Sequence, residues 1–350
     1  MLSWPASNGV RAMKVFAASF LALIILTFCA IDSAPANSMT STIAIGDARI
    51  NFTVEGGRMD LPQVEISEWV RAAAESVATY YGRYPLEHVT IRIASFDGRG
   101  VRNGRTFGRD GGFIVIRLGS ETTAANLQSD WMLTHEMIHL AFPSVAEKHH
   151  WIEEGISTYV EPIARVRAHH MDAAKMWFEL VRDLPQGLPA AGDQGLDHTH
   201  TWGRTYWGGA LFCFLADLEI HRQTNNRKGL EDALRGILNA GGDIRFEWGL
   251  EKAFKTGDEA TGIAELQSLY DRMKDRPYSV DLEAIWRELG IVRGDNFVRF
   301  IDSAPLAATR EGITWGSGAT AHAHSATSAT RGSTALRYRA VHAGRTARLR

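Results

Sequence analysis

The sequence predicts an α+β protein in which a small mixed α/β lobe, residues 41–118, is followed by a mainly helical domain, residues 119–313. In the first part, apolar and polar residues alternate as they do in half-buried strands, and glycines interrupt the alternation. In the second part, nearly all apolar stretches have helical length and spacing. The 350 residues, 45% of them hydrophobic, are enough to bury the core of one large domain or of two small ones.

The lobe is predicted to contain strands on either side of one long helix. Residues 42–57 have the pattern of two strands interrupted by glycines, and residues 65–84 form a strong helix with Pro85 just beyond its end. Residues 89–96 alternate again, and residues 111–119 form a β-rich run. We expect the glycine- and arginine-rich segment that leads into this run to be a loop.

The helical domain shows no internal repeat. Its expected helices cover residues 130–142, 151–166, 171–181, 206–223, 230–239, 262–273 and 281–289. Cys213 lies in one of these apolar runs, so we expect it to be a buried small side chain rather than a reactive thiol.

The first 36 residues have the pattern of a signal peptide. Arg11 and Lys14 precede an apolar run, Val15–Ile31, and Ala34–Ala36 looks like the small-residue site at which such segments are cleaved. The alternative is an uncleaved membrane anchor, because the run is marginally long enough to span a bilayer. In either case we expect the chain to be exported, to the periplasm or outside the cell.

Residues 316–350 contain arginine but no acidic residue and are rich in small and polar residues, which predicts a disordered basic tail. Such a tail could contact an anionic cell envelope.

The whole chain has a formal net charge of −2, which gives no indication of a nucleic-acid partner. The sequence leaves the oligomeric state open.

The densest group of titratable residues begins with the run HEMIH, residues 135–139. On a helix, His135 and His139 project from one face one turn apart, so both imidazoles could reach one zinc ion. Glu136 could then touch a water on that ion. The flanking residues are apolar, so the helix is expected to be buried, where unpartnered polar groups are costly. The spacing therefore predicts a zinc site rather than a chance match.

A catalytic zinc needs a third protein ligand and one open position. The residues that follow offer several carboxylates and imidazoles: Glu147, His149, His150, Glu153 and Glu154. Helical phase does not separate the last two, because both lie off the apolar face of the predicted helix. The residues alone leave this choice open.

The segment WIEEGISTYVE, Trp151–Glu161, resembles the second-helix motif of the gluzincin metallopeptidases, in which a tryptophan, two residues and then glutamate-glycine supply the third ligand. The resemblance implies that Glu154 is the ligand. It also places Thr158 one turn later, where a hydroxyl could hydrogen-bond a ligand. The remaining candidates are then expected to be solvated: His149, His150 and Glu153.

The segment Thr205–Leu238 resembles the helix that follows the catalytic tyrosine in the glycyl aminopeptidase family, with Tyr206 and Gly209 at the matching places. This implies that the Tyr206 phenol donates a hydrogen bond to the oxyanion of a tetrahedral intermediate. Without the resemblance, Tyr206 would be taken as a core aromatic residue. The sequence differs from that family in two respects: the connection from His139 to Glu154 is short, and no C-terminal peptide-binding domain follows. The resemblance therefore does not identify the substrate.

We therefore expect an exported, zinc-dependent, gluzincin-like peptidase whose site lies in a cleft between the lobe and the helical domain. Glu136 would take a proton from the attacking water and pass it to the leaving amine. The alternative is a peptidase-shaped binding protein of the cell envelope that no longer cuts. We favour hydrolysis because the motif residues are complete, and a non-peptide bond as substrate is a third possibility.

Aminopeptidases of related families hold the free amino group of the substrate with a carboxylate just before the strand that precedes the zinc-binding helix. At that place this chain has Arg109, with Arg105 nearby and Asp110 as the one negative charge. Arginines that face the cleft would repel an ammonium group, so the enzyme would not require a free N-terminus and would favour acidic or blocked peptides. The alternative is a mobile hairpin whose arginines point to solvent.

Overall fold

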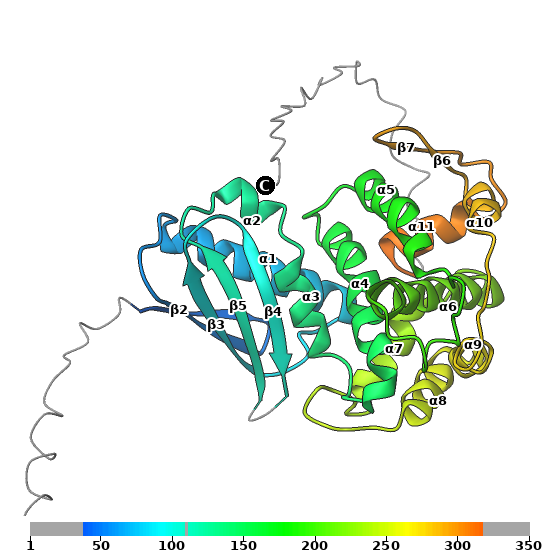
Figure 1. Cartoon of the computed structure of the whole chain (residues 1–350), viewed down its shortest axis with the longest axis horizontal. Coiled ribbons are helices and arrows are strands. Elements are labelled where there is room, and N and C mark those ends of the chain that lie inside the picture. The colour runs from blue at the N-terminus through cyan, green and yellow to red at the C-terminus, as the bar shows by residue number, and fades with distance from the viewer. Residues whose placement is uncertain (1–37, 109–110, 318–350) are drawn as a thin grey trace, which may run out of the picture.

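The computed structural model describes residues 38–108 and 111–317, which form an α+β structure (Figure 1). The predicted fold class is confirmed: a five-stranded sheet with one long helix comes first, and helices follow. The first elements are β1 (Met39–Ile45), β2 (Ala48–Glu55), α1 (Gln63–Tyr81), β3 (His88–Phe96), β4 (Val101–Phe107) and β5 (Gly112–Gly119). The predicted signal segment and nearly all of the predicted tail lie outside the described residues.

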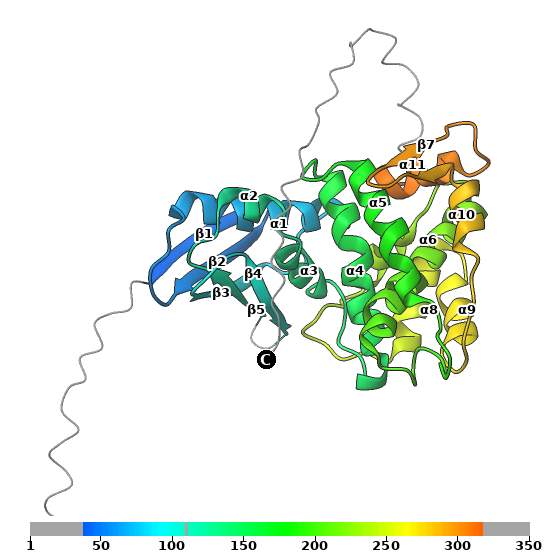
Figure 2. The same cartoon turned by 45° about the horizontal axis from the view of Figure 1, so that its top comes forward.

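The sheet has the strand order β1-β2-β3-β5-β4, with parallel pairs in the middle and an antiparallel pair at each edge. Between β1 and β2 the chain turns at Gly46, whose φ of 56° is a left-handed conformation that glycine adopts without strain. α1 connects β2 to β3 and covers one face of the sheet, while the opposite face of the described sheet carries no helix in either view (Figures 1 and 2). The apolar side chains of α1 and of the covered face form one core.

The prediction of a loop before residue 111 is wrong, because this segment forms the edge strand β4. Its sequence, VRNGRTF, lacks the apolar alternation of a half-buried strand, and the strand carries a β-bulge. Arg102 pairs with Arg117 and Arg105 pairs with Val115, so β4 contains one more residue than β5 over this stretch. Asn103 lies at the bulge with a φ of 51°.

The part of the chain after β5 is mainly helical. The elements are α2 (Ala124–Gln128), α3 (Met132–His139), α4 (His150–Arg167), α5 (Ala173–Asp183), α6 (Gly209–Thr224), α7 (Leu230–Asn239), α8 (Leu250–Thr261), α9 (Glu265–Met273), α10 (Leu282–Glu288), β6 (Ile291–Arg293), β7 (Val298–Phe300) and α11 (Ala307–Trp315). Short 3-10 turns cover Glu147–His149 and Leu184–Gly187, and a π-helical turn, Gly203–Gly208, precedes α6. No helix in the described ranges is both long and apolar enough to cross a membrane.

Some of these elements differ from the prediction. The predicted helix over residues 206–223 begins as the π-helical turn, and helices α2, α8 and α11 and the β6–β7 hairpin were not expected. α8 contains lysines, threonines and an interior glycine, and it is amphipathic with few apolar residues, so its pattern is weak. Cys213 is buried, as predicted.

Helix α4 lies at the centre of the molecule and packs against α1, α3 and α6 (Figures 1 and 2). It approaches the start of α6 closely at Gly155, where a Cβ atom would lie 2.3 Å from the backbone carbon of Gly209. Two glycines are therefore required where these helices meet. This contact fixes the residues of α4 relative to the π-helical turn, which carries Tyr206.

Candidate metal centre

Helix α3 is buried, and its first turn is held in place by Asp130. The carboxylate of Asp130 accepts hydrogen bonds from the backbone N–H groups of Met132 and Leu133, which would otherwise lack partners at the start of a helix. It also accepts one from Trp69 Nε1 of α1, at 3.0 Å. Burial raises the pKa of Asp130, and these hydrogen bonds oppose that rise. The helix that carries His135 and His139 is thus tied to α1.

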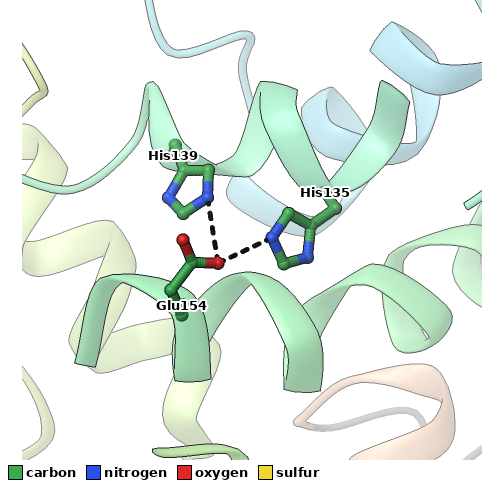
Figure 3. A group of neighbouring side chains, drawn as sticks. All are labelled: His135, His139 and Glu154. Atoms are coloured by element: carbon green, nitrogen blue, oxygen red, sulfur yellow. Dashed lines mark hydrogen bonds and ion pairs between the residues drawn. The ribbon is translucent and has the colours of Figure 1, made fainter. Parts of the chain in front are cut away.

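The structure brings His135 and His139 of α3 together with Glu154 of α4 (Figure 3). Glu154 Oε2 lies 3.0 Å from His135 Nε2 and 3.6 Å from His139 Nε2. A tetrahedral zinc with bonds of about 2.0–2.2 Å holds its ligand atoms roughly 3.3–3.5 Å apart. The three ligand atoms, all within 4.8 Å of one another, therefore fit one zinc ion.

The electrostatics of this group favour a cation. Burial alone would raise the pKa of Glu154, but hydrogen bonds from His135, His139 and His150 outweigh burial and hold this pKa far below its usual range. Burial lowers the pKa of His135, whereas for His139 the nearby Glu154 overcomes burial and raises the pKa. A charged carboxylate beside a readily neutral imidazole is the state that metal binding needs.

Glu136 lies against strand β4. Its Oε2 atom accepts a hydrogen bond from the Thr106 hydroxyl at 2.7 Å, and the same hydroxyl lies 2.8 Å from the Glu136 carbonyl oxygen. A Cβ atom on Gly104 would lie 2.3 Å from Glu136 Oε1, so a larger residue here would displace this carboxylate from its present position. The edge strand therefore fixes the side chain predicted to be the general base.

Tyr206 comes from the π-helical turn and faces the metal group. Its ring stacks on that of His135, with centroids 6.3 Å apart, and on that of Trp202, with centroids 5.8 Å apart. Burial, followed by the charge of Glu154, raises the pKa of Tyr206 to about 12. The phenol therefore keeps its proton at neutral pH and can donate a hydrogen bond. π-helical turns recur at functional sites, and this one aims a side chain into the site.

One of the other candidate ligands, His149, lies in a separate buried network. His149 was expected to be solvated, and this is wrong: it is buried, with Nδ1 3.1 Å from Asp197 Oδ1. Asp197 also accepts hydrogen bonds from the Trp151 and Tyr270 side chains, and no pattern in the sequence indicated its role. His149 lies in the 3-10 turn before α4 and belongs to this buried network rather than to the metal group.

Glu153 and His150 lie at the edge of the site. Glu153 accepts a hydrogen bond from the Val145 backbone N–H at 3.2 Å and lies 3.0 Å from His150 Nδ1. Those contacts with Glu153, followed by those with Glu154, raise the pKa of His150 to about 10. Half-exposed His150 also reaches the oxygen of Glu154 that does not face the two histidines of α3, at 3.3 Å.

The group opens into a cleft of about 620 Å³. Strand β4 forms one wall, and α3, α4 and Tyr206 form the others, which agrees with the expected position between the sheet and the helices. Arg105 lines this cleft and is exposed. Arg109 and Asp110, the other residues considered for contact with a substrate amino group, lie outside the described residues.

A second, smaller cavity of about 240 Å³ adjoins the metal group on the side of α4 that carries Thr158. Thr158 and His135 both line it, and neither the Thr158 hydroxyl nor His135 Nδ1 has a hydrogen-bond partner among the described residues. The bond expected from Thr158 to a metal ligand is therefore not formed. Trp131 and Trp202, about half exposed, form the mouth of this cavity.

A second buried cluster contains Asp217, His221 and Glu231, which the sequence did not single out. Arg167 lies 3.4 Å from Glu231, and Asp217 accepts hydrogen bonds from the Tyr159 hydroxyl and from the Leu230 N–H. The Arg167 guanidinium thus offsets the charge of Glu231, and the two hydrogen bonds satisfy the carboxylate of Asp217. We regard this cluster as a charge network that joins α4, α6 and α7.

Comparison with known proteins identifies structures with a similar fold. No family model matches the sequence, and no curated protein matches it. The structure is similar to that of an aminopeptidase N family protein from Idiomarina loihiensis, with a TM-score of 0.55 and 14% identity over 73% of this chain and 50% of that one.

Two more distant structures are an M1 zinc metallopeptidase from Deinococcus radiodurans and yeast LTA4 hydrolase. The first has a TM-score of 0.47 and 16% identity over 70% of this chain and 53% of that one. The second has a TM-score of 0.47 and 15% identity over 72% of this chain and 43% of that one. The chain thus spans about half the length of each of these proteins. The peptidase fold expected from the motifs is confirmed by the first likeness, which bears on the fold alone.

Proposed function

We propose that this protein is a zinc-dependent hydrolase that cleaves peptide bonds. The observation that supports this proposal most strongly is that three functional groups from different elements lie at one cleft. These are the metal-ligating group of α3 and α4, the carboxylate of Glu136 held by β4, and the protonated phenol of Tyr206. A metal site, a proton acceptor and an oxyanion donor in one cleft are the parts that hydrolysis of an amide requires. The fold shared with an aminopeptidase N family protein adds to this argument.

His135, His139 and Glu154 would hold the zinc, since their ligand atoms are spaced for tetrahedral coordination and their charges suit a cation. A bound zinc ion supplies a Lewis acid that polarises a carbonyl group and makes water more acidic. Three protein ligands leave the fourth position open to the cleft.

The side chains around this position have separate roles. Glu136 accepts a proton from the attacking water and later donates it to the amine that leaves. Thr106 and Gly104 hold its carboxylate in one place. Tyr206 donates a hydrogen bond to the carbonyl oxygen as negative charge develops there. The cleft wall formed by β4 gives an extended chain a surface along which to lie.

We also propose that the protein is exported, on the basis of the apolar segment and cleavage-like site within residues 1–36. We favour hydrolysis over the alternative of a silent binding protein. Binding alone would not require a general base, yet the Glu136 carboxylate is present and held in position by β4.

The test is incubation of the purified, zinc-loaded protein with a mixed peptide library, followed by mass spectrometry of the products. The matched control is Glu136→Gln, which keeps the zinc ligands and removes the proton acceptor. Cleavage by the wild type and not by the variant is the expected result. Equal product patterns from both proteins, or no cleavage by the zinc-loaded wild type, would contradict the proposal.

A further inference from the structure

Three exposed arginines lie on the uncovered face of the sheet beside the cleft: Arg102 and Arg105 of β4, and Arg117 of β5. The β-bulge places them together. In a regular strand, residues three apart face opposite sides. Here the extra residue sets Arg102 opposite Arg117 and Arg105 opposite Val115, and cross-strand partners share a face. Val115 and Arg117 are two residues apart, so these three arginines, called the arginine cluster below, face one side.

The charge of the arginine cluster is not neutralised within the described part of the chain. Other arginines of the lobe form ion pairs, such as Arg92 with Glu55 and Arg99 with Glu121, but the structure pairs none of the cluster with a described acid. Arg102 and Arg117 are direct cross-strand partners, and like charges in that position oppose strand pairing.

The guanidinium groups of Arg102 and Arg117 lie over the ring of Phe96, at 4.8 Å and 5.2 Å from its centroid, and this contact holds the two groups in place. Guanidiniums that have no acidic partner among the described residues are suited to binding carboxylates, which each can engage through two parallel hydrogen bonds.

The arginine cluster is continuous with the proposed active site. Arg105 itself lines the cleft, and its neighbours in β4, Gly104 and Thr106, contact Glu136 from the other face of the strand. Since a strand rises about 3.3 Å per residue, the cluster lies within a few residues' length of the proton acceptor. A chain that runs along β4 into the cleft therefore passes these guanidiniums, on a face that no described helix covers (Figures 1 and 2).

We propose that the arginine cluster binds acidic side chains of the peptide substrate, so that the enzyme prefers peptides with Asp or Glu near the scissile bond. This inference rests on the proposed peptidase function. A peptide is favoured over an anionic membrane because one member of the cluster belongs to the lining of the cleft itself.

The test compares matched peptides that carry either glutamate or glutamine at the positions before and after one cleavable bond. The wild type should have a kcat/KM ratio of at least about tenfold in favour of glutamate at low salt, and the ratio should fall as salt screens the charges. The triple variant Arg102→Gln, Arg105→Gln, Arg117→Gln should bring the ratio near 1. Arg49→Gln is the matched control: Arg49 is exposed on β2 of the same sheet, and its variant should keep the ratio.

The same proteins are assayed for binding of a fluorescent glutamate peptide and of phosphatidylglycerol vesicles. A ratio near 1 in an active wild type, or a ratio that the triple variant retains, would overturn the inference. So would a triple variant that loses only vesicle binding, since the cluster would then serve a membrane. If the wild type cuts no peptide at all, the proposed function fails, and the peptide-binding assay still tests the cluster.

Discussion

Thr106 Oγ1 of strand β4 donates a hydrogen bond to Glu136 Oε2 of helix α3 over 2.7 Å. This contact joins the sheet to the helix that carries the predicted zinc ligands. It means that the lobe does more than form a wall of the cleft, because it holds the side chain that we propose as the proton acceptor. Gly104, two residues earlier in β4, leaves the space into which that carboxylate fits.

We predict that Thr106→Val lowers kcat by roughly tenfold or more with little change in KM, since a hydrogen bond to a charged group contributes about 1.5–3 kcal/mol. Thr106→Ser keeps the hydroxyl and should restore most of the rate. Steady-state kinetics with one peptide substrate, together with zinc analysis of each protein, checks this. A valine variant with wild-type kcat would show that Glu136 needs no support from β4.

We predict that Tyr206→Phe lowers kcat by roughly 10²–10³, which is the usual effect of removing one oxyanion donor. The variant keeps the ring and its stacking on His135 and Trp202, so zinc content and melting temperature should not change. The control is Trp202→Phe, which alters the stacking but no hydrogen-bond donor. An unchanged rate in Tyr206→Phe would make Tyr206 a packing residue.

Glu161 should make stability depend on pH. Burial raises the pKa of Glu161 to about 7 from an ordinary value of 4.5, although Arg165 at 2.9 Å opposes the rise. The folded protein thus binds this proton more tightly than the unfolded chain does. The stability that it contributes is fully present below about pH 4.5 and is lost as the pH rises to about 7, by about 3 kcal/mol at most.

The measurement for this prediction is the melting temperature of the wild type and of Glu161→Gln across this pH range, in the metal-free proteins. Their difference should change between pH 4.5 and 7, with the wild type losing stability relative to the variant. Glu179→Gln, a more exposed residue that lines the same cavity, should follow the wild type. Parallel curves for the wild type and Glu161→Gln would show that the ion pair with Arg165 keeps this carboxylate charged.

The end of the described chain packs against α7. The Ser317 backbone N–H donates to Glu231 Oε1 at 2.8 Å, and its hydroxyl donates to Asp232 Oδ2 at 2.9 Å. We predict that removal of residues 318–350 leaves the melting temperature and peptide cleavage unchanged, whereas removal of residues 316–350 lowers the melting temperature by a few °C. Calorimetry of the two truncated proteins checks this. A large loss in the shorter truncation would show that residues beyond Ser317 contribute to stability.

The sequence predicts those parts of the site that lie within one helix. The spacing of His135 and His139 follows from helix geometry alone. The choice of Glu154 over Glu153 does not, because it depends on how α4 rotates against α3, and the resemblance to a known motif was needed to make it. The burial of His149 was not predicted because its partner, Asp197, comes from a loop that is distant in the sequence.

The sheet was predictable where one face is buried, as in β2, β3 and β5, whose residues alternate. Strand β4 was not, because an edge strand with a bulge and mostly polar residues has no apolar period to detect. Strand β4 contributes two features to the site. Its support of Glu136 depends on contact with α3, and its part in the arginine cluster depends on pairing with β5. Long-range contacts of this kind leave no local pattern in the sequence.

The central claim is that His135, His139 and Glu154 hold one zinc ion, and zinc analysis of purified ligand variants tests it most directly. We predict one zinc per chain in the wild type and in Glu153→Ala, whose carboxylate hydrogen-bonds Val145 and His150, and loss of zinc in Glu154→Ala. Circular dichroism of each protein separates loss of metal from loss of fold. Full zinc occupancy in a folded Glu154→Ala, with loss in Glu153→Ala, would contradict the account.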